Sequence, residues 1–477
     1  MSKLAELVSL CKRRGLVFPG SEIYGGLSGT YDYGPVGVAL KRNVADAWWR
    51  AFVTRRSDAV FGLDSCVLLS PKVWRASGHA DGFTDPLCEC PKCARRFRAD
   101  HLLEQVSKAA APADPASLAR AIEERRARRE WSCPECRDEA AQLSAPREFN
   151  LMFGTRVGAA DGGEPAYFRP ETAQGAYVNL DNVAKAVRRD KLPFGIAQVG
   201  KAFRNEVTPS NFIFRTREFE QLELQWFCDA SESSKYHAYW VNECLAFAVD
   251  VCGLKPENLR LRRHAKDELA HYARATTDIE YRFPFGWGEL WGVADRGDHD
   301  VKAHERGSGQ RLWPAAQQTP CVVEPSLGTN RMMLAVLCDA WEASPAPDPA
   351  RGDKPRGAVL RLPPALAPYE LAVFPVVTNV PELVEAARGV FRRAVEWDAR
   401  ADLGLDRQAV GKKYARHDEI GTPVCAVVDD RTLRDGSFTV RDRDTAKQIR
   451  VPSDAAASRE AWNRIVLAGL RGVSPPP

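Results

Sequence analysis

A charged hairpin near the middle of the chain constrains the fold and the chemistry more than any other part of the sequence. An apolar run from Phe194 to Val199 leads into Phe203-Arg204-Asn205-Glu206, and the segment from Arg215 to Glu223 leads back into a second apolar run. The pattern is Phe-Arg-x-Glu, a loop of eight residues, and Arg-x-x-x-Phe-x-x-x-Glu. Because alternate residues of a strand share a face, Arg204 and Glu206 are predicted to reach one ligand.

The residue types of this hairpin suit a nucleotide. A guanidinium such as that of Arg204 can bind a phosphate through two parallel hydrogen bonds, and the carboxylate of Glu206 can accept from an adenine amino group. The ring of Phe219, on the returning strand, can stack on adenine. The alternative interpretation is a surface hairpin with alternating charges, but six positions fit one pattern. The hairpin therefore predicts a nucleotide site.

The chain has 477 residues, which is enough for about three domains. Strand-like runs at Phe194 to Val199, Phe212 to Phe214 and Leu222 to Phe227 predict one antiparallel sheet. This sheet lies in residues 149–343, which we expect to form one body with residues 1–84.

The remaining parts are a linker, a last domain and an insertion. Residues 344–357 are rich in proline, lack apolar periodicity and are predicted to be a linker. Residues 358–477 alternate strand-like runs with a helix that begins at Pro381, so an α/β domain is expected. Residues 85–148 interrupt the first body, and their charged helical stretch from Ile122 to Arg129 suggests a peripheral insertion with too few apolar residues for its own core.

An amphipathic helix is expected after Tyr33-Gly34-Pro35. Apolar side chains follow at intervals of four and share one helix face: Val36, Leu40, Val44, Trp48 and Phe52. Two interpretations stay open. The helix packs this stripe on its own core, or it forms a subunit interface.

The cysteines predict a metal site. Cys90-Pro-Lys-Cys93 and Cys133-Pro-Glu-Cys136 are two C-x-x-C pairs, and each pair can offer two thiolates to a tetrahedral Zn²⁺. We expect a structural zinc held by all four. The alternatives are a ligand set that includes Cys88, or reduced thiols without metal. The 13 cysteines are an odd number and mostly scattered, which favours a reducing compartment such as the cytoplasm.

Charge and hydropathy exclude several classes of protein. The 67 Lys and Arg residues nearly balance 63 Asp and Glu residues, so any polyanionic partner must be bound by local basic surface. The 44% hydrophobic content is that of an ordinary globular enzyme. No charge-free stretch approaches the roughly 20 residues that a bilayer span needs. We therefore expect no membrane association.

The motifs together resemble a known family. The hairpin is similar to motif 2 of the class II aminoacyl-tRNA synthetases, Pro35 with its stripe to motif 1, and Glu324-Pro-Ser-Leu-Gly-Thr-Asn-Arg331 to motif 3. More narrowly, Arg169-Pro-Glu-Thr-Ala-Gln-Gly175 and Gly288-Glu-Leu290 resemble the dimeric glycyl-tRNA synthetase family. The likeness runs from about Leu7 to Val451, and the order and spacing of the motifs carry it.

The resemblance implies an α+β fold: a class II antiparallel-sheet catalytic domain, a zinc-ribbon insertion and a C-terminal α/β anticodon-binding domain. It implies that glycine and ATP, with Mg²⁺, give glycyl-adenylate, and that the glycyl group passes to tRNA-Gly, in a homodimer. The implied catalytic residues are Arg204, Arg215 and Arg331. The implied ATP-binding residues are Arg204, Asn205, Glu206, Phe214, Arg215, Phe219, Glu289, Leu290, Gly328 and Arg331, with Glu289 near the metal.

Selection of glycine is a problem of exclusion, because every competing amino acid is larger. The resemblance implies that carboxylates bind the ammonium group and crowd the α-carbon, so that any side chain clashes. The implied glycine-binding residues are Arg98, Glu171, Phe219, Glu220, Gln221, Leu222, Glu223, Arg296, Glu324, Pro325, Ser326, Leu327 and Gly328.

Two rival functions stay open. One is a homologue that forms an adenylate without charging tRNA, and the complete C-terminal domain argues against it. The other is a zinc-ribbon scaffold that binds nucleic acid without catalysis. That interpretation requires Arg204, Glu206 and Arg331 to match the motifs by chance.

Overall fold

The computed structural model describes residues 2–109, 111–112, 114–136, 141–158, 163–265, 269, 273–314, 318–343 and 357–471. The linker predicted over 344–357 lies outside these residues except for Gly357. Within the described ranges, no helix is both long and apolar enough to cross a membrane.

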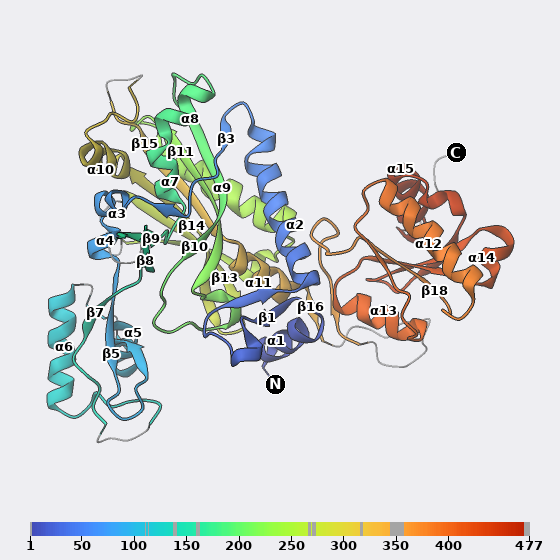
Figure 1. Cartoon of the computed structure of the whole chain (residues 1–477), viewed down its shortest axis with the longest axis horizontal. Helices are drawn as coiled ribbons and strands as arrows, with labels where there is room; N and C mark the ends of the chain where they lie inside the picture. The colour runs from blue at the N-terminus through green and yellow to red at the C-terminus, as the bar shows by residue number, and fades with distance from the viewer. Residues whose placement is uncertain are drawn as a thin grey trace.

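A seven-stranded sheet forms the centre of the larger lobe (Figure 1). Its strand order is β12-β13-β14-β15-β11-β10-β3, and every neighbouring pair is antiparallel except β10 and β3. The strands are β3 (Val60–Gly62), β10 (Phe194–Phe203), β11 (Glu218–Cys228), β12 (Leu259–Arg263), β13 (Ala275–Phe283), β14 (Gly286–Gly297) and β15 (Cys321–Gly328). The antiparallel sheet expected from the sequence is confirmed.

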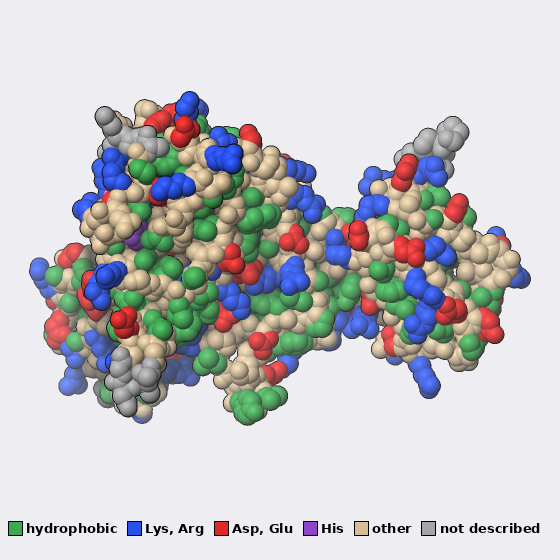
Figure 2. Space-filling view, turned by 45° about the horizontal axis from the view of Figure 1, so that its top comes forward, with side chains coloured by type: hydrophobic (Ala, Val, Ile, Leu, Met, Phe, Trp, Pro, Cys, Tyr) green, Lys and Arg blue, Asp and Glu red, His purple; other side chains and the backbone are tan. Residues whose placement is uncertain are grey.

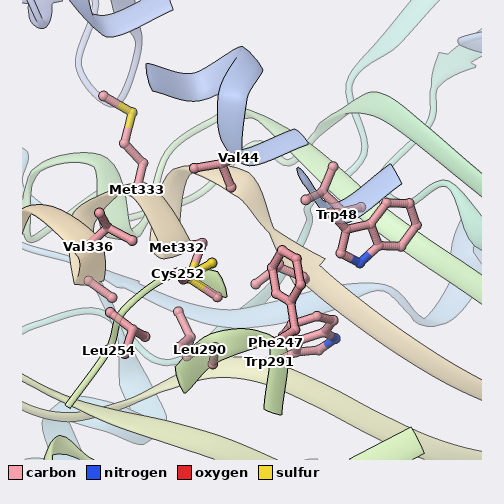
Figure 3. Close-up of a cluster of buried hydrophobic side chains, with 14 of the residues drawn as sticks. Val44, Trp48, Phe247, Cys252, Leu254, Leu290, Trp291, Met332, Met333 and Val336 are labelled. Carbon is pink, nitrogen blue, oxygen red and sulfur yellow. The ribbon is translucent and has the colours of Figure 1, made fainter. Parts of the chain in front are cut away.

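The two faces of this sheet differ in chemistry. Along β11, Leu222, Leu224 and Trp226 are buried in the main apolar core, whereas Gln221 and Glu223 are buried on the opposite face. Helices on the apolar side are α2 (Pro35–Phe52), α9 (Ser233–Ala246) and α11 (Thr329–Ala340). Figure 3 shows side chains of α2, α11 and β14 gathered in this core. Helices α7 (Ala173–Val178), α8 (Leu180–Ala186) and α10 (His299–Ser308) lie on the polar side.

Helix α2 begins at Pro35, as predicted. Its stripe from Val36 to Phe52 is at most 8% exposed within this single chain, because α11 and the sheet cover it. The stripe therefore packs on its own core. A partner subunit could meet only the other faces of α2.

Two local predictions around the hairpin are wrong. Strand β10 ends at Phe203, so Arg204 and Glu206 lie in the following loop and not on the strand. The segment Phe212–Phe214 is a 3₁₀ helix, η3, and not a strand. Its Ile213 is nonetheless fully buried.

A small unit extends from the body on the side away from the C-terminus (Figure 1). It comprises β5 (Thr84–Glu89), β6 (Arg96–Arg98), α5 (Ala99–Ser107), α6 (Pro115–Ala127) and β7 (Arg147–Asn150), with sheet order β6-β5-β7. Thr84 pairs with Asn150, so the chain enters and leaves this unit side by side. The expectation that it lacks a core is wrong. Leu103, Ile122 and Trp131 belong to a separate buried cluster within it.

The C-terminal lobe has its own five-stranded sheet, of order β19-β18-β20-β21-β22. The strands are β18 (Leu371–Pro375), β19 (Ala401–Leu403), β20 (Val424–Val428), β21 (Phe438–Asp442) and β22 (Gln448–Val451). Strand β18 is parallel to β19 and β20, and the other pairs are antiparallel. Its longer helices are α12 (Pro381–Glu396) and α13 (Val410–Glu419), followed by α14 (Asp430–Asp435).

Shorter elements complete the body and the lobe ends. The helices are α1 (Lys3–Arg13), α3 (Pro71–Ala76), α4 (His79–Gly82), α15 (Arg459–Ala461) and α16 (Ala468–Arg471). The strands are β1 (Val17–Pro19), β2 (Tyr31–Tyr33), β4 (Leu68–Leu69), β8 (Gly154–Val157), β9 (Glu164–Phe168), β16 (Trp341–Glu342) and β17 (Val359–Leu360). Figure 2 shows that a narrower waist joins the two lobes and that charges of both signs are interspersed on the visible face.

Candidate active site

Two adjoining cavities lie on the polar face of the seven-stranded sheet. The first, of about 140 Å³, is lined by Arg204, Glu206, Ile213, Phe214, Arg215, Thr216, Phe219, Gln221, Glu289, Leu290, Ser326, Gly328, Asn330 and Arg331. The second, of about 290 Å³, is lined by Glu171, Arg204, Gln221, Glu223, His264, Thr276, Asp278, Glu289, Gly292, Ala294, Arg296, Glu324 and Ser326. Arg204, Gln221, Glu289 and Ser326 border both cavities, so ligands in the two would touch.

Arg204 is held in place between the two cavities. Its Nε donates to the carbonyl oxygen of Pro170 at 3.0 Å. Its guanidinium lies over the ring of Phe219, 5.3 Å from the centroid, and at 5.4 Å from that of Phe83. A cation fixed in this way needs little rearrangement to meet a phosphate.

Two further arginines line the first cavity, and carboxylates pair with both. Arg215 Nη1 lies 3.3 Å from Glu206 Oε2. Arg331 donates to Glu289 Oε2 at 3.0 Å and lies over the ring of Phe214, 4.4 Å from the centroid. Desolvation beside the cavity wall raises the pKa of Glu289, but Arg331 outweighs it and leaves that pKa below its ordinary value. A phosphate bound here would exchange these ion pairs for its own.

A buried carboxylate cluster occupies the second cavity. Arg296 donates from Nη1 to Glu324 Oε1 at 3.0 Å and from Nε to Asp300 Oδ2 at 2.8 Å. Glu324 also accepts from Gln225 Nε2 at 2.8 Å, and Glu223 accepts from the hydroxyl of Thr172. Arg296 thus pairs with two of these carboxylates at once, and its single positive charge does not balance their negative charges.

The pKa values of these carboxyl groups diverge. Burial, followed by the charges of Glu324 and Glu171, raises the pKa of Glu223 to about 8. Burial also raises the pKa of Glu324, against the effect of Arg296. For Glu171 burial is outweighed by His79, whose Nε2 lies 3.4 Å away, and by Arg296, so its pKa falls below the ordinary value. Near neutral pH the cluster therefore holds a proton that an entering ammonium group can replace.

Several residues that the sequence indicated do not bring their side chains to these cavities. Glu220 lies on the other face of β11 and pairs with Lys41 at 3.1 Å. Leu222 and Leu327 are fully buried in the apolar core. Pro325 also lies on the face of β15 away from the cavities, because strand positions alternate.

Arg98 and Asn205 are also outside both cavities. Arg98 belongs to the small insertion, where it contacts Asp85 at 3.0 Å and Asp100 at 2.6 Å. Asn205 donates its backbone N–H to the carbonyl oxygen of Leu151 at 2.7 Å. The remaining predicted residues of the nucleotide and glycine sets line one or both cavities.

Residues that the sequence did not indicate complete the site. Thr172 and Gln225 hold Glu223 and Glu324, and Asp300 shares Arg296. Thr172 lies inside the motif from Arg169 to Gly175, so the sequence could have indicated it as a site residue. The other two carry no local pattern. Asn330, in motif 3, lines the first cavity with its Nδ2 3.5 Å from Thr216 Oγ1.

The four cysteines of the two C-x-x-C pairs meet in space. The Sγ atoms of Cys90, Cys93, Cys133 and Cys136 all lie within 4.8 Å of one another. Cys88 lies outside this group, with its Sγ 3.5 Å from the carbonyl oxygen of Phe97. Burial raises the pKa of Cys90, but backbone N–H groups of Cys93 and Lys92 outweigh it and leave that pKa at about 7.

Comparison with known proteins gives a consistent result. Residues 159–339 match the model of the tRNA synthetase class II core domain (G, H, P, S and T), and residues 370–459 match the anticodon binding domain. A glycine–tRNA ligase of Geobacillus thermodenitrificans is 45% identical over 463 residues, covering 94% of this chain and 95% of the relative. That of Alkaliphilus metalliredigens is 46% identical over 467 residues, covering 94% and 96%.

A solved structure shares the fold. Prolyl-tRNA synthetase from Cryptosporidium parvum superimposes with a TM-score of 0.61 at 15% identity, covering 98% of this chain and 77% of that one. The expected α+β class II architecture is therefore confirmed. By its sequence and its domain content, the chain belongs to the glycine–tRNA ligase family of class II aminoacyl-tRNA synthetases.

Proposed function

We propose that the protein activates glycine with ATP to form glycyl-adenylate and pyrophosphate, and then transfers the glycyl group to the 3′ end of tRNA-Gly. The observation that carries this proposal is the pair of cavities that share Arg204 and Glu289. One is lined by cations and aromatic rings suited to a nucleotide. The other is lined by carboxylates suited to an ammonium group.

Activation needs no protein nucleophile. A carboxylate oxygen of glycine attacks the α-phosphorus, and the bond to the pyrophosphate oxygen breaks. Negative charge builds up at that phosphorus, where Arg204 stabilises it, while Arg215 and Arg331 hold the pyrophosphate side. Mg²⁺ bound beside Glu289 would neutralise further phosphate charge. Catalysis is then positioning and charge stabilisation.

The proposed glycine pocket combines Glu171, Glu223 and Glu324 with Ser326 and Arg296 around the ammonium and the α-carbon. Gln221, Phe219 and Gly328 border it on the nucleotide side. Any β-carbon would have to displace one of these polar contacts. The pocket thus excludes larger amino acids at the binding step, without a second hydrolytic site.

Glycine binding is expected to tighten as the pH rises towards about 8. Glu223 has a pKa raised to about 8, so below that pH its proton must leave before the ammonium binds. Well below pH 8, the affinity for glycine should rise about tenfold for each pH unit. The KM for glycine in pyrophosphate exchange, measured from pH 6 to pH 8.5, tests this. Glu223→Gln should bind glycine more weakly and without this slope. A parent enzyme with a flat profile would contradict the expectation.

The rest of the molecule serves the tRNA. The C-terminal lobe, residues 358–477, is proposed to bind the anticodon region, which its match to the anticodon binding domain supports. Residues 1–84 and 149–343 form the catalytic body. We also infer a homodimer that acts in the cytoplasm, with the exposed faces of α2, such as that of the 41% exposed Val38, available to the partner.

We propose further that the cysteine cluster holds a structural Zn²⁺. Four Sγ atoms within 4.8 Å of one another fit the soft-ligand, four-coordinate preference of this ion. All four positions come from the protein, so none is open to a substrate. The ion would tie the loop before β6 to the loop after α6 and so stabilise the insertion.

Replacing Cys90 and Cys133 together by serine is expected to abolish zinc binding. The parent should contain about one zinc per chain by elemental analysis, and the double variant clearly less. Cys88→Ser is the matched control and should keep the metal, because its Sγ lies outside the cluster. Equal zinc in the parent and the double variant would refute the site.

Glycine-dependent exchange of labelled pyrophosphate into ATP tests the proposed function. Exchange with glycine but not with alanine, followed by glycylation of tRNA-Gly, is the expected result. No exchange with glycine would overturn the proposal. Exchange without charging of tRNA would favour the adenylate-forming rival.

A further inference from the structure

The second cavity extends past the carboxylate cluster to a histidine that the steps above do not use. His264 follows β12 directly and lines this cavity together with Thr276 and Asp278 of β13 and Gly292 of β14. Glu324 and Glu223 come from β15 and β11, on the other side of β14 in the strand order. A cavity of about 290 Å³ is more than glycine needs, since glycine has no side chain. The end near His264 is therefore available to a second ligand.

The floor of this end is open because Gly292 carries no side chain. A Cβ at Gly292 would lie 3.4 Å from Glu289 Oε1 and 3.8 Å from Asp278 Oδ1. The carboxylates of Glu289 and Asp278 thus lie on either side of Gly292 at this end of the cavity. The ligand expected here is polar and carries hydroxyl donors.

His264 is held like an oriented base. Its Nε2 lies 2.7 Å from Asp278 Oδ2, and its backbone N–H donates to the carbonyl oxygen of Thr276 at 3.0 Å. Arg262 Nη1 also lies 3.4 Å from Nε2, but the carboxylate oxygen at 2.7 Å is the closer partner, so it fixes the proton on Nε2 and leaves Nδ1 as an acceptor. Within the described part of the chain, no side chain or backbone group hydrogen-bonds to Nδ1. Among the described residues, the charged groups around the pair are Arg262, whose Nη1 lies 3.4 Å from His264 Nε2 and 3.8 Å from Asp278 Oδ2, and Glu289.

The chemistry of the two steps decides which one needs such a base. In activation the nucleophile is the glycine carboxylate, which is already ionised. In transfer the nucleophile is a ribose hydroxyl, which must lose its proton as it attacks. An oriented imidazole beside the adenylate pocket therefore fits the second step and not the first.

We propose that His264 accepts the proton of the attacking ribose hydroxyl of the terminal adenosine of the tRNA, and that Asp278 orients it. This inference rests on the proposed function. The hydroxyl oxygen forms a bond to the carbonyl carbon of glycyl-adenylate. The bond between that carbon and the phosphate oxygen breaks, and AMP leaves with the electron pair. The hydroxyl proton moves to Nδ1 of His264 and then to solvent.

Separate measurement of the two steps tests this role. His264→Ala should keep pyrophosphate exchange within a factor of about three of the parent. Its single-turnover transfer from preformed enzyme-bound glycyl-adenylate to tRNA should fall about 100-fold. Added imidazole should restore part of the transfer rate, which a purely structural role would not allow.

Two further variants keep the test sharp. Asp278→Asn preserves the shape of the pair and removes the carboxylate, so it should slow transfer and leave exchange near the parent rate even if His264→Ala folds poorly. His237→Ala is the control, because His237 contacts the carbonyl oxygen of Val293 at 3.1 Å from α9, on the apolar side of the sheet. It should leave both steps unchanged.

Three outcomes would overturn the inference. Transfer at the parent rate in His264→Ala would exclude the role. So would an equal loss in both steps, which would place His264 at the nucleotide or the glycine instead. A parent enzyme without glycine-dependent exchange would instead refute the proposed function, and this role would fall with it.

Discussion

Arg204→Ala is expected to lower the rate of glycine-dependent pyrophosphate exchange by about 100- to 1,000-fold, or about 3–4 kcal/mol of transition-state stabilisation. Arg204 borders both cavities, and contacts with Pro170 and Phe219 hold it in place. In the proposed mechanism, its loss removes a fixed cation from the phosphorus at which charge builds up. Because that charge develops in the transition state, kcat should fall more than the KM for ATP or glycine rises.

A conservative substitution and a control variant accompany this measurement. Arg204→Lys should recover only part of the rate, because an ammonium group cannot make two parallel hydrogen bonds to a phosphate. Arg392→Ala is the control, since Arg392 lies on α12 of the C-terminal lobe in an exposed pair with Glu385. Exchange by Arg204→Ala at the parent rate would remove this arginine from the mechanism.

Arg296→Met is expected to destabilise the catalytic body by about 3–5 kcal/mol at neutral pH. Its side chain is 4% exposed and serves Asp300 and Glu324, which are 4% and 9% exposed. Within the described residues, Arg296 is the one cation that bonds to both, so its removal leaves two buried carboxylates without a compensating positive charge. Urea unfolding followed by tryptophan fluorescence would measure the loss, and glycine activation should fall with it.

The pH dependence of this loss has a definite sign. Burial without Arg296 raises the pKa values of Asp300 and Glu324 in the folded state above their unfolded values. The penalty is therefore full above the folded values and disappears as the pH falls to the unfolded values near 4. Adding Glu324→Gln to Arg296→Met should recover part of the stability. A penalty that is independent of pH would contradict this account.

Periodicity predicted the long elements well. Helix α2, strands β10 and β11 and the alternation in the C-terminal lobe follow from spacing and from proline positions. The four cysteines of the two C-x-x-C pairs also lie together as predicted, because residues three apart in a tight turn can point their thiols to one side.

The failures arose where local pattern and tertiary contact compete. The run from Phe212 to Phe214 has the composition of a strand, but Asn211 and Phe212 adopt positive φ values of 56° and 59°. Ile213 then reaches the core from a 3₁₀ turn. At the end of β10, Asn205 bonds to Leu151, far away in the sequence, and this contact leads the chain out of the sheet. No short-range signal in the sequence reports such a contact.

Strand geometry also limits what motifs can say about a site. Motif 3 predicted every residue from Glu324 to Gly328, yet β15 turns Pro325 and Leu327 away from the cavities. Conversely, Gln225 and Asp300 reach the carboxylate cluster from positions without a recognisable pattern. The site is assembled by the sheet, and a linear motif shows only part of it.

The pairing of Thr84 with Asn150 has an evolutionary consequence. Because the two strands leave the body as neighbours, a short turn could replace everything between them without rerouting the remaining chain. The unit beyond that point has its own buried cluster of apolar side chains and its own group of four cysteine thiols. It can therefore be gained, lost or exchanged as a module during evolution, without a change in the path of the chain through the two cavities.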